Sequence, residues 1–96
     1  MTLEERLRFY HKGETNAVKS SVLEKIYQCT GGEIRKEINE LRCKGVPICS
    51  TRKGYFYAAS TVEIDKTIAQ LSSRINKIMD AKSGMTKSLE RRGTFG

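Results

Sequence analysis

Apolar residues recur at helical spacing in two short segments near the N-terminus, residues 3–12 and 21–28. A capping box marks the start of each segment. In such a box a hydroxyl residue precedes a glutamate by three positions, here Thr2 with Glu5 and Ser21 with Glu24. Reciprocal side-chain bonds of this kind satisfy the free amides at a helix start. The pattern therefore predicts two amphipathic helices, each with one face turned to a core.

A third helix is predicted between Gly32 and Gly45. The stretch Thr30-Gly31-Gly32 is expected to break the chain tightly, and Gly45 to supply a left-handed cap at the other end. Between them the apolar residues step by four and three: Ile34, Ile38 and Leu41. Two helices joined by a short glycine-containing turn have the spacing of a helix-turn-helix, in which the second helix lies across the first.

Beyond Pro47 the pattern becomes that of strands. Ile48-Cys49-Ser50 and Tyr55-Phe56-Tyr57-Ala58 flank Thr51-Arg52-Lys53-Gly54, which predicts a β-hairpin with glycine where a positive φ is needed. The clustered aromatic residues are more typical of a small core than of a stacking platform for single-stranded nucleic acid.

The longest periodic segment is predicted to be a helix over residues 61–82, opened by a capping box from Ser60 to Glu63. Its apolar residues step alternately by four and three, with Lys82 in one place of the series: Ile64, Ile68, Leu71, Ile75, Ile78 and Met85. A seam this narrow suits a coiled coil, so self-association is its simplest use. The alternative is that the seam packs on the first helix within a monomer.

Together these elements predict an α+β fold that is mainly α: a winged helix-turn-helix of three helices and a β-hairpin wing, then a long C-terminal helix. The expected divisions are residues 1–59 for the winged helix-turn-helix, 60–82 for the coiled-coil-like helix, and 83–96 for a basic tail that frays or moves. The length of 96 residues fits one modest core.

The chain is basic, with 18 lysines and arginines against 11 acidic residues, a net charge of +7. Residues 28–57 hold six basic and three acidic side chains, and residues 82–96 hold four and one. Positive charge concentrated in this way favours polyanionic partners.

The chain offers little for catalysis or metal binding. Cys29, Cys43 and Cys49 lack metal-site spacing and share one histidine, His11, so we expect small buried hydrophobes in a reducing compartment. The hydroxyls have no evident base, and no phosphate-binding Gly-Lys-Ser/Thr loop occurs. We expect no enzyme, cofactor or metal. No signal peptide or membrane segment is expected, which points to the cytoplasm.

The run from Ile34 to Tyr57 resembles the recognition helix and wing of the biotin operon repressor type of winged helix-turn-helix. It matches that pattern at Ile34, Ile38, Leu41, Arg42, Gly45, Lys53, Gly54 and Tyr55. With the two preceding helices the resemblance covers residues 3–58. It departs in the turn, where Cys29-Thr30-Gly31-Gly32 replaces the usual Gly-x-Ser-Arg, and these 96 residues contain nothing like the family's biotin ligase domain. The expected arrangement, a small domain of this wing type followed by one long helix, also resembles proteins encoded by bacteriophages and other mobile elements.

In a helix-turn-helix, the residues opposite the apolar stripe of the third helix meet double-stranded DNA. Arg35 and Asn39 are the expected base readers, since arginine pairs with guanine and asparagine with adenine, each worth about 1–3 kcal/mol of discrimination. The expected phosphate contacts are Lys36, Arg42 and the start of the second helix near Ser20 and Ser21. Arg52 and Lys53 on the wing would reach the backbone or minor groove. Against this, Glu33, Glu37 and Glu40 would make the same helix an ion-paired, solvated surface.

The leading hypothesis is a sequence-specific DNA-binding regulator, acting as a homodimer on a palindromic site. One alternative is a phage-type protein that binds a host protein or nucleoprotein, for example an inhibitor of an RNA-guided nuclease (an anti-CRISPR), working in the host cytoplasm. Another is an architectural or replication-initiation accessory with little sequence preference.

Overall fold

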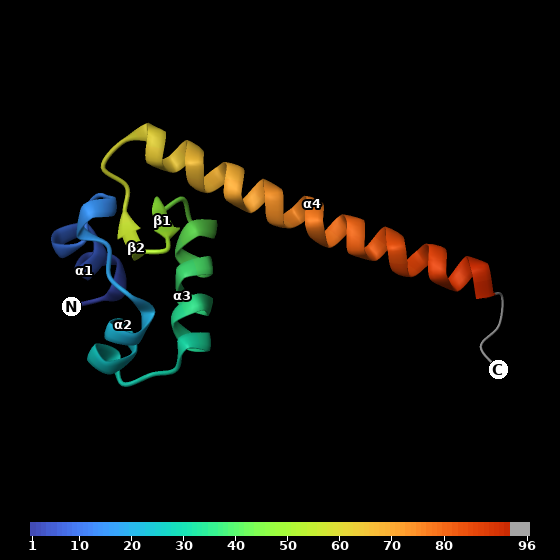
Figure 1. Cartoon of the computed structure of the whole chain (residues 1–96). Coiled ribbons are helices and arrows are strands. Elements are labelled where there is room, and N and C mark those ends of the chain that lie inside the picture. Colours follow the sequence, from blue (N-terminus) through green and yellow to red (C-terminus); the bar gives the residue numbers. More distant parts are fainter. Residues whose placement is uncertain (93–96) are drawn as a thin grey trace.

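The computed structural model, which describes residues 1–92, is mainly helical with one small antiparallel hairpin and a long C-terminal helix (Figure 1). The expected α+β, mainly α, class is therefore confirmed. In chain order the elements are α1 (Leu3–Tyr10), η1 (Glu14–Asn16), α2 (Ser20–Tyr27), α3 (Gly31–Cys43), β1 (Ile48–Thr51), β2 (Gly54–Tyr57) and α4 (Thr61–Arg92).

The start of α1 is the expected capping box. The Glu5 amide donates to Thr2 Oγ1 at 3.2 Å, and the Thr2 amide donates to Glu5 Oε1 at 3.1 Å. The box predicted for α2 is wrong. This helix begins one residue earlier, after Lys19, and no side chain caps it. Instead the Ser20 hydroxyl donates to Glu24 Oε2 at 3.0 Å, which leaves Ser21 inside the first turn.

The turn between α2 and α3 lies earlier than predicted. Gln28 takes the left-handed conformation, with φ 51°, and Thr30 caps α3 through a reciprocal box with Glu33. Because that box starts the helix at once, Gly31 and Gly32 are its first residues rather than a break. Gly31 also permits close packing, since a Cβ there would lie 3.3 Å from Glu24 Oε2.

The end of α3 is the predicted glycine cap. Gly45 has φ 90°, its amide donates to the Arg42 carbonyl at 2.9 Å, and the Val46 amide donates to the Leu41 carbonyl at 3.0 Å. These two bonds make a Schellman motif and satisfy carbonyls that the helix would otherwise leave free. The chain is thereby turned into β1.

The segment between α1 and α2 pairs with the outer edge of β2 through isolated backbone bridges. Tyr57 pairs with Ile48 and Gly54 with Thr51 within the hairpin. On the other side of β2 the Val18 amide donates to the Tyr55 carbonyl at 2.9 Å, and the Val18 carbonyl accepts from the Tyr55 amide at 2.8 Å. Gly54, with φ 121°, sits so close that a Cβ would lie 2.1 Å from the Val18 oxygen. Both the close approach of Val18 and the positive φ therefore require glycine at position 54.

The core has two parts. The larger one joins the three N-terminal helices to the hairpin: Leu3, Leu7, Val18, Leu23, Ile34, Ile38 and Ile48. The smaller one consists of Cys49, Phe56 and Ala58, and Ile64 of α4 packs against it. Cys49 is buried as expected, but Cys29 is half-buried and Cys43 is exposed, because Cys43 lies on the face of α3 away from the core.

The predicted end of the C-terminal helix is wrong, because α4 continues to Arg92. A glycine such as Gly84 costs a helix about 1 kcal/mol, too little to end it by itself. The predicted tail thus begins as helix, and residues 93–96 lie outside the described residues. The first turn is fastened by Glu63, whose carboxylate accepts from the amides of Ala59 at 2.7 Å and Glu14 at 3.0 Å.

The contacts between α4 and the rest of the domain are confined to its beginning. Ile64 and Leu71 are half-buried and Thr67 is buried, whereas from residue 72 to residue 91 every side chain except Ser88 is exposed. Figure 1 shows the helix leaving the domain and extending away from α1. The alternative that the seam packs on the first helix is therefore wrong. Among residues 1–92, no helix combines the length and hydrophobicity that crossing a membrane requires.

Candidate nucleic-acid interface

The two buried isoleucines of α3, Ile34 and Ile38, fix which way its polar residues face. Since successive residues turn by about 100°, Arg35, Asn39 and Arg42 lie on one flank of the helix. The opposite flank carries the acidic residues: Glu33, Glu37 and Glu40. Lys36 lies between the flanks, away from the core. The two arginines of α3 thus lie on the flank opposite its glutamates, whereas Lys36 is one helical turn from both Glu33 and Glu40.

Arg42 shows which flank faces the hairpin. Its Nε donates to the Ile48 carbonyl at 2.8 Å and its Nη2 donates to Ser50 Oγ at 3.3 Å. Partial burial lowers the pKa of Arg42, although a guanidinium stays charged in proteins. Because Arg42 holds β1 against α3, we assign it to the structure and leave it out of the phosphate contacts that we propose below.

The β1–β2 turn is attached to the start of α2. Arg52 and Lys53 are exposed, and the Lys19 ammonium donates to the backbone oxygen of Arg52. The Lys53 amide donates to Thr51 Oγ1 at 3.2 Å, which orders the turn from inside. Arg52 and Lys53 therefore lie beside the N-terminus of α2.

The start of α2 in turn lies beside the start of α3. Glu24, which accepts the Ser20 hydroxyl, borders Gly31 together with Arg35: a Cβ on Gly31 would be 3.3 Å from Glu24 Oε2 and 3.5 Å from Arg35 Nη1. Contacts thus connect the β1–β2 turn to α2, and α2 to the start of α3. They make one surface, whose exposed cations are Lys19, Arg35, Lys36, Arg52 and Lys53.

The residues predicted for DNA contact are mostly accessible on this surface. Arg35, Lys36, Asn39, Arg52, Lys53 and Ser21 are exposed, while Ser20 is half-buried with its hydroxyl engaged by Glu24. Sequence reasoning missed Lys19, which it left in a loop. Its position directly before the first residue of α2 was the available signal, since a cation there lies at the helix N-terminus that the sequence analysis assigned to phosphate contact.

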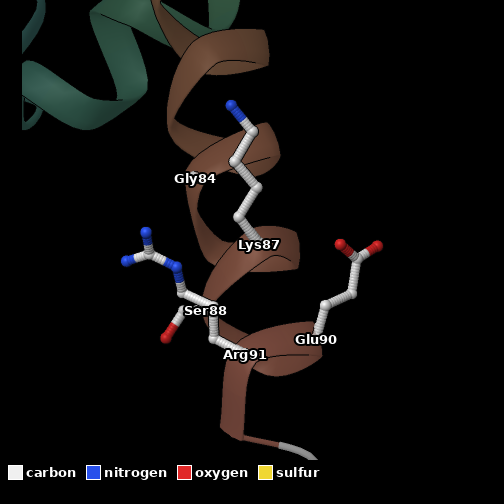
Figure 2. A pocket seen from close by; sticks show the side chains of 5 residues that line it. All are labelled: Gly84, Lys87, Ser88, Glu90 and Arg91. Atoms are coloured by element: carbon white, nitrogen blue, oxygen red, sulfur yellow. The ribbon is translucent and has the colours of Figure 1, made fainter.

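A depression on the last turns of α4 is lined by Gly84, Lys87, Ser88, Glu90 and Arg91. Figure 2 shows the Lys87, Glu90 and Arg91 side chains pointing away from one another around a single helix, so they do not converge on a ligand. Within residues 1–92, no three potential metal ligands come together.

The seam residues predicted for an interface divide into two groups. Ile64 and Leu71 are half-buried against the domain, whereas Ile68, Ile75 and Ile78 are exposed. A scan of protein-family models and searches of curated proteins and solved structures find no match to this chain.

Proposed function

We propose that this chain binds double-stranded DNA as a winged helix-turn-helix, with α3 in the major groove and the β1–β2 turn on the adjacent backbone. Two helices joined by a three-residue turn and followed by a hairpin support this assignment. The net charge of +7 supports it further, because phosphate neutralisation supplies most of the affinity of such proteins.

The observation that carries the proposal is the separation of charge on α3. The flank with Arg35 and Asn39 faces the same side as the hairpin, as the bonds of Arg42 to β1 establish, while the glutamates face away. A polyanion approaching the hairpin side meets the wing cations and the basic flank together. This arrangement argues against the alternative interpretation, in which the glutamates neutralise the positive charge of the whole helix.

We assign a role to each exposed residue from its position and from the groups that its side chain offers. Arg35 and Asn39 would read base edges in the groove, since their side chains have the donor patterns suited to guanine and adenine. Lys36, Lys19, Arg52 and Lys53 would contact phosphates, which sets the position of the protein without reading sequence.

The experiment starts with a random duplex library, from which bound DNA is recovered and sequenced, followed by titration of the enriched duplex. We expect Arg35→Ala to reduce the preference for the enriched sequence over random DNA. We expect Lys53→Ala to weaken both equally and to lower the slope of log affinity against log salt by about one. Lys44→Ala is the matched control, because it removes the same charge from the end of α3 on its glutamate flank.

Three results would refute the proposal: no binding at low salt, no enriched sequence, or equal effects of Lys53→Ala and Lys44→Ala. Absence of binding at low salt would favour the protein-binding alternative. Binding without enrichment would favour an accessory that uses the backbone alone.

A further inference from the structure

The free part of α4 carries an apolar seam longer than the sequence analysis placed on it. Because the helix continues to Arg92, the steps of four and three extend to Leu89: Ile64, Ile68, Leu71, Ile75, Ile78, Lys82, Met85 and Leu89. Four of these apolar side chains beyond the domain are more than half exposed: Ile75 at 56%, Ile78 at 68%, Met85 at 73% and Leu89 at 59%. The seam spans almost four heptads, or about 38 Å of helix, the length at which such a pattern indicates a coiled coil.

At its domain end the seam enters an apolar groove of about 340 Å³. One wall is formed by Ile64, Ile68 and Leu71 of α4, and the other by Val46 and Pro47 after α3. The seam and the groove are thus one continuous surface, and an apolar helix lying along the seam would end in the groove.

We propose that the occupant is the α4 helix of a second copy of this chain, paired antiparallel. In one register every seam position meets a seam position of the partner chain: Ile64 with Leu89, Ile68 with Met85, Leu71 with Lys82, and Ile75 with Ile78, each twice by symmetry. A shift by one heptad leaves seam residues unpaired at both ends. This register also places the two apolar side chains at the far end of α4, Met85 and Leu89, in the groove of the other copy.

Lys82 favours this direction over the parallel one. In a parallel pair in register, equivalent positions face each other, so two Lys82 ammonium groups would meet at one layer of the seam. In the antiparallel pair each Lys82 packs its methylenes on Leu71 and extends its charge to water, about 16 Å along the axis from the other Lys82.

The position of the domains favours the same direction. Each domain flanks its own seam from Ile64 to Leu71. A parallel pair would bring both domains to the same end of the helices, where the two domains would have to occupy the same space. An antiparallel pair separates them to opposite ends.

Directed cysteine cross-linking tests the register in the full chain, without nucleic acid, so that its failure leaves the proposed function standing. Cys43→Ser and Cys29→Ser remove the accessible thiols, and buried Cys49 is kept. Ile68→Cys with Met85→Cys should then form a covalent dimer under mild oxidation, mapped by mass spectrometry to a bond between positions 68 and 85. A bond within one chain is excluded, since the two positions lie about 26 Å apart on one helix.

Two controls make the outcome decisive. Met85→Cys alone should remain uncross-linked, and Ser73→Cys with Asp80→Cys should not react, because that pair has the same register on the outer side of the helices. A bond between two copies of position 85 would overturn the antiparallel direction. A monomeric mass of the unsubstituted chain by light scattering, at the protein concentration used for cross-linking, would overturn the pairing altogether.

Discussion

Replacement of Gly54 by alanine tests the packing on which the wing depends. Gly54 combines φ 121° with the close approach of Val18, whose carbonyl oxygen would lie 2.1 Å from an added Cβ. That atom belongs to the backbone and cannot turn aside. The added methyl group must therefore separate β2 from the Val18 edge or change the turn itself.

The expected magnitude follows from these two effects. Positive φ costs a residue with a Cβ about 1–2 kcal/mol. Separation would also break the two bonds between Val18 and Tyr55, each worth about 0.5–1.5 kcal/mol. We expect Gly54→Ala to lower the free energy of unfolding by about 2–5 kcal/mol, and the melting temperature by at least about 10 °C for a domain of this size.

Gly45→Ala is the matched control. Gly45 has a similarly positive φ of 90°, but a Cβ there would meet nothing within 4 Å. Urea unfolding followed by tyrosine fluorescence, at one fixed protein concentration, compares the two variants directly, since the chain has four tyrosines and no tryptophan. If Gly54→Ala is no less stable than Gly45→Ala, the close approach of Val18 contributes nothing and the reasoning is refuted.

Three further predictions concern the seam of α4, the contact of Arg42 with β1, and the attachment of α4 through Glu63. Ile78→Glu should convert a dimer to a monomer by light scattering, whereas Asn76→Glu, on the outer side of the helix, should not; equal masses for both would contradict the seam. Arg42→Ala should lower the free energy of unfolding by about 1–3 kcal/mol, because the Ile48 carbonyl loses its side-chain donor; unchanged urea unfolding would show that the bond is dispensable. The amides of Ala59 and Glu14 lower the pKa of Glu63, so its carboxylate stabilises the fold above the ordinary carboxyl pKa, and that contribution is lost as the pH falls through the lowered pKa. The stability advantage of the native chain over Glu63→Gln should therefore shrink on acidification, and a difference that is constant with pH would argue against this attachment.

Elements whose signals are local could be predicted from the amino-acid sequence. A capping box at Thr2, the apolar steps of α3 and the glycine after it all act within one or two helical turns, so their physics is complete in a short segment. The hairpin and its glycine were predicted for the same reason. The predicted cap of α2 was wrong. The Ser20 hydroxyl bonds to Glu24 and the helix starts at Ser20, and the sequence pattern does not distinguish this start from one at Ser21.

Features that depend on residues far apart in the chain could not be predicted in this way, because they arise from packing between elements. Arg42 and Arg35 both lie on the same flank of α3, yet one braces β1 and the other is exposed, and only the position of the hairpin separates their roles. The need for glycine at position 54 likewise comes from Val18, which is distant in sequence. In α4 the apolar steps indicate that the seam is buried against another surface, but they do not identify that surface. Burial within a chain and burial between chains remove the same apolar area from water.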